Sequence, residues 1–129
     1  MEGQQTVISI LGGGASSVII LDKIVANPKR DKVLVRIFEG GDKPIGPGYA
    51  FDPNQSETNL TNSPIDYVTI KGEQDEAHFL KWLKANQDKW ATSFPEIARD
   101  IEQLTLSGSF LPRKLAGMYL EASYKELRE

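Results

Sequence analysis

The stretch TVISILGGGASS, residues 6–17, decides how the amino-terminal part of this chain folds. Its first half, residues 6–11, is a short run of mostly apolar and β-branched side chains, which is typical of a strand buried on both faces. The three glycines that follow, residues 12–14, interrupt that run, because glycine favours tight turns and weakens regular elements. The stretch therefore predicts a strand that runs directly into a glycine turn.

A helix and a second strand follow the glycine turn. Residues 15–27 carry apolar side chains on one helical face, and Ser16 or Ser17 can serve near the amino-terminal cap. Asn27-Pro28 ends the helix, because proline disfavours helical geometry in the residue before it. Residues 33–38, VLVRIF, form the second buried strand. Strand, turn, helix and strand predict a βαβ unit with parallel strands and a right-handed crossover.

The rest of the chain divides into a loop and a mainly helical part. Residues 40–66 are rich in glycine and proline, and they predict a long functional or mobile loop. We expect a short strand at 67–70 and helices at 76–86, 95–104 and 112–127. Residues 1–129 then form one α/β domain, or the amino-terminal fragment of one. Its parts are a βαβ unit (1–39), a loop (40–66) and helices (67–129).

Composition excludes several classes of function. Hydrophobic residues make up 40% and charged residues 26% of the 129, which is ordinary for a globular chain. The net charge of −3 predicts no nucleic-acid partner and no membrane partner. The chain has no cysteine and a single histidine, His78, which we expect to be exposed; thiolate and multi-histidine metal sites are therefore excluded. Without a signal peptide or an apolar run of ~20 residues, we expect a cytoplasmic protein.

The glycine turn carries the strongest chemical signal. Gly12 permits the tight turn, and the missing side chain at Gly14 lets a pyrophosphate approach the backbone. Free amides and the helix dipole at the following helix start favour anionic phosphates. The pattern is G-x-G-x-x-S, so Ser17 replaces the third glycine and is expected to push the helix slightly outward. The alternative interpretation is a glycine-rich turn in an ordinary α/β protein.

Glu39 is the second signal, because it ends the second strand 25 positions after Gly14. An acidic side chain there can accept hydrogen bonds from both ribose hydroxyls of an adenosine. The alternative is a solvent-facing charge at a strand end. No basic cluster follows Glu39, which argues against a site for a 2′-phosphate.

Several separated motifs resemble the FAD-NAD(P)-binding protein family. They are residues 7–17, Ile37-Phe38-Glu39, Gly46-Pro47-Gly48-Tyr49-Ala50-Phe51, Asn59-Leu60-Thr61-Asn62-Ser63-Pro64, Phe79-Leu80-Lys81-Trp82-Leu83, Phe110-Leu111-Pro112-Arg113 and Gly117-Met118-Tyr119-Leu120. The resemblance implies a partial Rossmann-like dinucleotide-binding fold, with FAD, or alternatively NAD(P), as cofactor. It places the loop 46–51 near the cofactor. Since family members continue for several hundred residues, it also implies a fragment that lacks its carboxy-terminal portion or that self-associates.

The expected cofactor-binding residues follow from the turn, the acidic residue and the resemblance. They are Gly12, Gly13, Gly14, Ala15, Ser16, Ser17, Glu39 and Gly48. None of them is a catalytic acid or base, and no metal site is expected.

Two further groups of residues have open interpretations. Asn59, Asn62 and Ser63 either hydrogen-bond to a flavin or, as we favour, cap local turns. Arg113 either contacts a phosphate or, as we favour, begins the last helix.

The leading functional hypothesis is the FAD-binding portion of a flavin-dependent oxidoreductase. An S-adenosylmethionine-dependent methyltransferase is an alternative, because it uses the same glycine turn and acidic residue. A Rossmann-like interaction module without catalysis is a third hypothesis. In the leading hypothesis the isolated chain binds the dinucleotide and does not turn over by itself.

Overall fold

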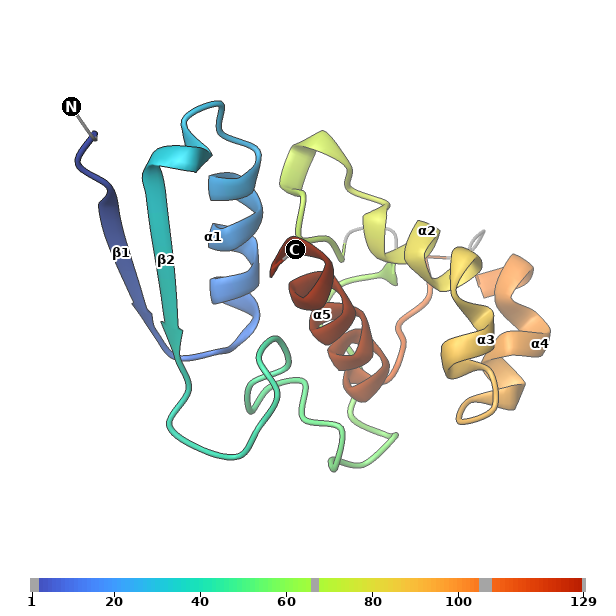
Figure 1. Ribbon diagram of the computed structural model, residues 1–129. Coiled ribbons are helices and arrows are strands. Elements are labelled where there is room, and N and C mark those ends of the chain that lie inside the picture. The colour runs from blue at the N-terminus through green and yellow to red at the C-terminus, as the bar shows by residue number, and fades with distance from the viewer. Residues whose placement is uncertain (1–2, 66–67, 105–107, 129) are drawn as a thin grey trace.

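A computed structural model describes residues 3–65, 68–104 and 108–128 of the chain (Figure 1). Its amino-terminal part consists of strand β1 (Thr6–Leu11), helix α1 (Ala15–Val25) and strand β2 (Val33–Phe38). The strands are parallel, with Thr6 opposite Val33 and Leu11 opposite Phe38. Both strands have the predicted ends, and the partial Rossmann-like α/β fold is confirmed.

α1 ends at Val25, slightly before the predicted end at Asn27. The side-chain oxygen of Asn27 accepts a hydrogen bond from the backbone N–H of Lys29 at 2.9 Å, which turns the chain away from the helix. A 3-10 helix, η1 (Arg30–Lys32), then leads into β2.

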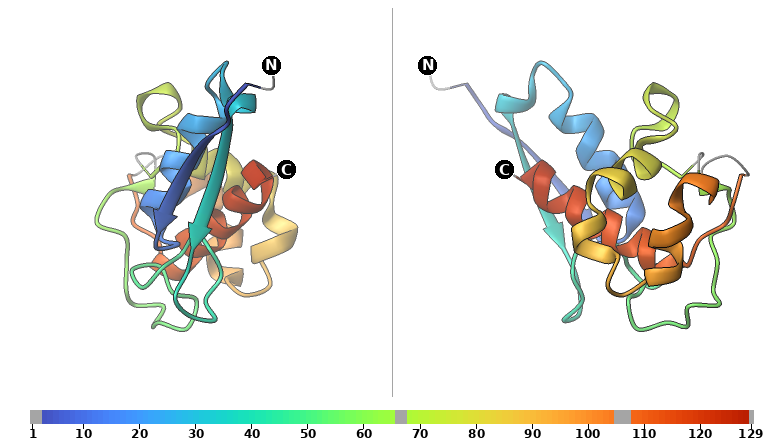
Figure 2. Two further views of the ribbon diagram at one scale, coloured as in Figure 1. Left: turned by 60° about the vertical axis from the view of Figure 1, so that its left-hand side comes forward. Right: turned by 90° about the vertical axis from the view of Figure 1, so that its right-hand side faces the viewer.

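The prediction that both strands are buried on both faces is wrong. Paired residues Val7 and Leu34 are 50% and 38% exposed, and the pair Leu11 and Phe38 is 84% and 51% exposed. Successive strand side chains point to opposite faces, so these residues share the face turned away from α1. Figure 2 shows the two strands with the described helices on one side only. The strands are therefore half covered, because the described residues supply only one of the two layers that bury a parallel sheet.

The carboxy-terminal part is helical, as predicted. It contains η3 (Gly72–Gln74), α2 (His78–Ala85), α3 (Gln87–Trp90), α4 (Pro95–Leu104) and α5 (Arg113–Arg128). The helices predicted at 76–86, 95–104 and 112–127 correspond to α2, α4 and α5, whereas α3 was not predicted.

The predicted loop is present over its described residues, and the described part of the predicted strand at 67–70 is not a strand. Residues 40–65 form turns, with one isolated bridge between Leu60 and Pro112. Val68–Ile70 are outside any strand, and Tyr67 lies outside the described residues.

The hydrophobic core lies among the helices. α5 packs against α1 on one side and α2 on the other (Figure 1). Phe79, Trp90, Leu115 and Tyr119 have no exposed surface. The indole N–H of Trp90 donates to the carbonyl of Leu83 at 2.9 Å, so this tryptophan packs in the core with its polar atom bonded.

Candidate functional site

The glycine turn between β1 and α1 is held from three directions. The N–H of Gly12 donates to the carbonyl of Phe38 at 2.7 Å, which extends the pairing of the strands by one residue. The N–H of Gly13 donates to Oε2 of Glu39 at 2.8 Å. The carbonyl of Gly13 accepts from the N–H of Gly46 at 2.6 Å. The turn is therefore fixed before any ligand arrives.

Two glycines are required here by backbone shape and close approach. Gly12 has φ +102°, a conformation that other residues rarely adopt. Gly48 has φ +58°, and a Cβ at this residue would lie 3.0 Å from the Cα of Gly14. Gly14 itself has an ordinary φ of −84°, so its missing side chain concerns space and not strain. The loop 46–51 thus returns across the glycine turn, and Gly48 lies beside Gly14.

The same loop is wedged against α5. A Cβ on Gly46 would lie 2.7 Å from the backbone carbon of Leu120. Lys43 and Asp52 close the base of the loop with an ion pair of 2.6 Å, and the Lys43 ammonium lies 3.8 Å from the ring centre of Tyr49. The hydrogen bond from Lys43 lowers the pKa of Asp52. Contacts at both ends therefore hold the loop in place over the turn.

Neither serine caps the amides at the start of α1, which corrects the predicted capping role. The N-cap is Gly14, and it makes no side-chain cap hydrogen bond. The hydroxyl of Ser17 donates to the carbonyl of Gly14 at 2.6 Å, and Ser17 is buried. The first amides of a helix, here those of Ala15 and Ser16, have no partner within the helix. This end of α1 therefore carries donors and a partial positive charge that suit an anion.

Glu39 has a structural task that the sequence did not reveal. The carboxylate follows β2 directly and is half-buried, and Oε2 accepts the Gly13 amide. A carboxylate has a second oxygen and further lone pairs, so Glu39 can still accept hydrogen bonds from a ligand. All eight predicted site residues thus meet at the carboxyl ends of the two strands, where open α/β sheets bind ligands.

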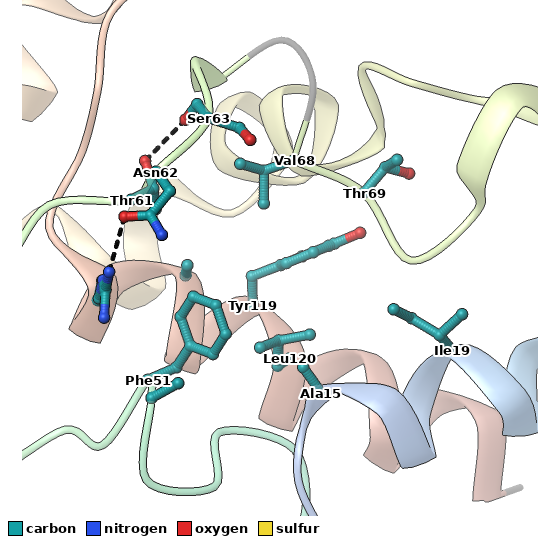
Figure 3. A pocket seen from close by; sticks show the side chains of 13 residues that line it. Ala15, Ile19, Phe51, Thr61, Asn62, Ser63, Val68, Thr69, Tyr119 and Leu120 are labelled. Atoms are coloured by element: carbon teal, nitrogen blue, oxygen red, sulfur yellow. Dashed lines mark hydrogen bonds between the residues drawn. The ribbon is translucent and has the colours of Figure 1, made fainter.

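A cavity of about 340 Å³ adjoins the start of α1 (Figure 3). Ala15 and Ile19 of α1, Phe51 of the loop and Tyr119 and Leu120 of α5 form part of its wall. Residues 61–63 and 68–69 line the remaining side and add polar groups. Because residues far apart in the sequence build this cavity, no local sequence pattern indicated it.

Arg113 and Asn62 form part of the polar rim of the cavity. Arg113 is the first residue of α5, as favoured from the sequence. Its Nη2 donates to Oδ1 of Asn62 at 2.8 Å, and its Nε donates to the carbonyl of Leu60 at 2.8 Å. The guanidinium therefore fastens the 60–62 segment. Asn62 receives this bond, so its observed role differs from the turn cap that the sequence favoured.

The expectation that His78 is an ordinary exposed histidine is wrong. Its ring is half-buried, and Nδ1 lies 2.6 Å from the hydroxyl oxygen of Tyr119, which also accepts the Ile70 amide at 3.1 Å. Burial, and secondarily the charge of Lys71, lowers the pKa of His78. Burial also raises the pKa of Tyr119 to about 12. At neutral pH the tyrosine is therefore protonated and the histidine neutral, which fits a hydroxyl that donates to the ring.

Two other kinds of feature are absent from the residues that the structure describes. These residues contain no group of three or more His, Cys, Asp or Glu side chains that could hold a metal ion. None of their helices is both long enough and apolar enough to cross a membrane.

Comparison with known proteins identifies one family. The family described as FAD-NAD(P)-binding matches residues 9–129, which is nearly the whole chain. No curated protein and no solved structure gives a significant match.

Proposed function

The chain belongs to the FAD-NAD(P)-binding family, and from this premise we propose that it is the FAD-binding portion of a flavin-dependent oxidoreductase. Binding of FAD, or of NAD(P), follows from the family. The oxidoreductase role and the residues that hold the cofactor are our proposal. A bound flavin supplies the redox chemistry, and the residues of this chain bind and orient it.

One observation supports the proposal above all others, namely the hydrogen bond from the Gly13 amide to Glu39. It fixes the acidic side chain beside the glycine turn. Acceptors for ribose hydroxyls and free amides for a pyrophosphate are then adjacent, and an adenosine diphosphate group needs both. The residues present therefore fit the nucleotide half of FAD.

We assign each predicted site residue a role in this arrangement. The amides of Ala15 and Ser16 bind the pyrophosphate, and Glu39 binds the ribose of the adenosine. Gly12 and Gly13 shape the turn, and Ser17 supports it through the carbonyl of Gly14. Gly14 and Gly48 lack side chains where the two backbones and the ligand approach one another.

Titration of the purified chain tests the proposal. We expect saturable binding of FAD, detected by isothermal titration and by the yellow colour of the bound flavin. ADP is expected to bind more weakly than FAD, because it offers only the nucleotide half. Binding of S-adenosylmethionine with no binding of FAD would contradict the proposal and favour the methyltransferase hypothesis.

We expect the isolated chain to bind FAD without turnover. Hydride transfer needs the flavin ring held rigidly against a nicotinamide or substrate with water largely excluded. The sequence after Glu39 has no second glycine fingerprint for a nicotinamide cofactor. Oxidation of NADH or NADPH should therefore stay at the rate of free FAD. Flavin-dependent turnover above ~1 per second would show a complete enzyme.

The outer edge of β1 is the natural place for a protein partner. β1 pairs with β2 on one side, and no described strand lies along its other side. Its sequence, TVISIL, has neither a charge nor a proline to discourage pairing. We propose that a second copy, or a further segment of the polypeptide, adds a strand there in the cytoplasm. Measuring the mass in solution across a concentration series distinguishes a homo-oligomer from a monomer.

A further inference from the structure

We propose that the side-chain amide of Asn62 donates a hydrogen bond to an acceptor on the edge of a flat ring that fills the cavity beside α1. Arg113 is the residue that positions the Asn62 amide. The ring is the isoalloxazine of FAD, so this inference rests on the proposed function. It adds a residue that selects for the flavin half of the cofactor. The eight residues of the glycine turn and its surroundings select for the nucleotide half.

The orientation of the Asn62 amide follows from the chemistry of its neighbour. A guanidinium carries donors and no acceptor, so the group that faces Arg113 at 2.8 Å must be the side-chain oxygen of Asn62. The NH₂ group then points the other way. Figure 3 shows this nitrogen on the side of the amide that faces Phe51, where Asn62 lines the exposed rim of the cavity. Asn62 therefore offers a donor to whatever occupies the cavity.

The backbone around Asn62 is held on both sides. The N–H of Thr61 donates to the carbonyl of Leu111 at 2.9 Å, and the N–H of Arg113 donates to the carbonyl of Asn59 at 2.7 Å. The Thr61 hydroxyl donates to the carbonyl of Ser63 at 2.9 Å, which braces the turn from within. Asn62 is thus a preorganised donor, whose ordering cost is met before the ligand binds.

Other polar groups of the wall are engaged within the chain. The Thr69 hydroxyl donates to the carbonyl of Asp75 at 2.6 Å and accepts the Lys71 amide at 2.9 Å. The Tyr119 hydroxyl is shared between the Ile70 amide and His78. The hydroxyls of Thr69 and Tyr119 thus bond within the chain. Of the two other polar side chains on this side of the wall, Asn62 and Ser63, the Asn62 amide is the one that a side-chain hydrogen bond from Arg113 orients.

The remaining wall selects the class of ligand. Ile19, Phe51, Val68 and Leu120 are apolar, and the ring of Tyr119 extends along the cavity (Figure 3). The volume of about 340 Å³ lies in the range of small-ligand sites. A flat apolar ring with carbonyl or ring-nitrogen acceptors at one edge would pack against these apolar side chains and accept the hydrogen bond from Asn62. Ala15 at the start of α1 also lines the cavity, so one ligand can place its pyrophosphate at the amides there and its ring in the cavity.

Asn62→Asp is the sharpest test, because it keeps the shape and exchanges the donor for an acceptor. Arg113 would hold one carboxylate oxygen, so the fold should survive, and the other oxygen would face the ring. We expect the Kd for FAD to rise about tenfold, as for an acceptor left facing an acceptor, with the Kd for ADP unchanged. Asn54→Asp is the matched control, since Asn54 is exposed and lies outside the cavity wall. It should bind FAD like the parent.

Arg113→Lys tests the positioning role. A lysine keeps the charge but cannot hold Leu60 and Asn62 with a fixed fork, so the amide is free to turn. We expect a smaller loss of FAD affinity, about threefold to tenfold, with ADP unaffected. In an Asn62→Leu background the same change should have no further effect on FAD, because Arg113 acts through Asn62. An equal effect in both backgrounds would show that Arg113 is only structural.

The remaining outcomes separate this inference from the proposed function. If the parent binds FAD and ADP, and Asn62→Asp binds FAD with the parent's Kd, then Asn62 does not donate a hydrogen bond to the ring. The dinucleotide proposal stands in that case. If Asn62→Asp weakens FAD and ADP by the same factor, the effect is not specific to the ring, and the inference is again wrong. If the parent binds neither compound, the proposed function fails and this inference fails with it.

Discussion

Replacing Glu39 tests two tasks of one side chain, and each task has its own measurement. The carboxylate accepts the Gly13 amide at 2.8 Å, and in the proposed site it also binds the ribose of the adenosine. Glu39→Ala removes both functions. Glu39→Gln keeps an oxygen that can accept the Gly13 amide but loses the negative charge. The two variants should therefore differ in stability and resemble each other in weakened binding.

The stability effect follows from the burial of the hydrogen bond. In Glu39→Ala the amide of the buried Gly13 loses its acceptor, which costs about 1–2 kcal/mol of the free energy of unfolding. For a chain of this size the melting temperature should then fall by roughly 3–10 °C. In Glu39→Gln the amide keeps an acceptor, so the loss should stay below about 0.5 kcal/mol. Thermal unfolding without ligand, followed by circular dichroism, measures both changes.

The binding effect comes from the hydrogen bonds between the charged carboxylate and the ribose hydroxyls. Losing them should cost about 1–3 kcal/mol, which raises the Kd for FAD roughly 5-fold to 150-fold. ADP carries the same ribose and should lose the same factor. Glu76→Gln is the matched control, because Glu76 is an exposed carboxylate away from the glycine turn.

One result would refute the reasoning about the ribose. If Glu39→Gln and Glu39→Ala both bind FAD and ADP with the parent's Kd, the carboxylate serves the glycine turn alone. A fall in stability without any loss of affinity would lead to the same conclusion. The adenosine would then have to lie elsewhere on the chain.

Three further predictions concern the turn, the helix contacts and pH. Gly14→Ala should keep the parent's stability, because its Cβ would lie at an ordinary 3.9 Å from the Cα of Gly48, but it should weaken FAD binding. Gly48→Ala should cost about 1–2 kcal/mol of stability, because Gly48 has a positive φ and its Cβ would lie 3.0 Å from the Cα of Gly14. Gly41→Ala, with open space around it, is the control for both. Lys71→Met should lower the free energy of unfolding in urea by about 2–3 kcal/mol, because it leaves the buried carboxylate of Asp22 without its ion pair. This is less than the loss expected for a fully buried ion pair, because Lys71 is partly exposed. Lys81→Met, at the more exposed ion pair with Asp75, is the control and should cost less than about 1 kcal/mol. Burial lowers the pKa of His78 in the folded state, so the unfolded chain takes up the proton at a higher pH, and stability should fall as the pH drops below 6.5. His78→Gln should flatten that part of the plot of stability against pH. An unchanged plot would show that His78 is not the group responsible.

The βαβ unit could be predicted because its signals are local. The glycines, the apolar runs and Pro28 each act on their immediate neighbours, and both strands have the predicted ends. Burial was predicted less well, because it depends on what packs against a strand and not on the strand itself. Val7 and Leu34 are apolar, and both are exposed in the described structure.

The candidate site shows the same division between local and distant contacts. The residues of the glycine turn were found from a short pattern, and Glu39 from its place after β2. The bond between Glu39 and Gly13 joins residues 26 apart, and the bond between His78 and Tyr119 joins residues 41 apart. Residue type and helical spacing give no information about such pairs. Asn62 was named from the sequence as one of three possible flavin contacts, but the hydrogen bond from Arg113, 51 residues away, that orients its amide could not be predicted.

The position of the core explains why the two halves of the proposed site differ in character. Tyr119 and Leu120 belong both to the cavity wall and to the core, so the ring end of the site is built into the best-packed part of the molecule. The nucleotide end depends instead on the turn between two strands that are covered on one face. The hydrogen bonds that Glu39 and Gly46 make with the turn compensate for that thin support. A substitution in the turn can therefore alter ligand binding while the helical core stays folded, whereas a substitution in the deep cavity wall affects both.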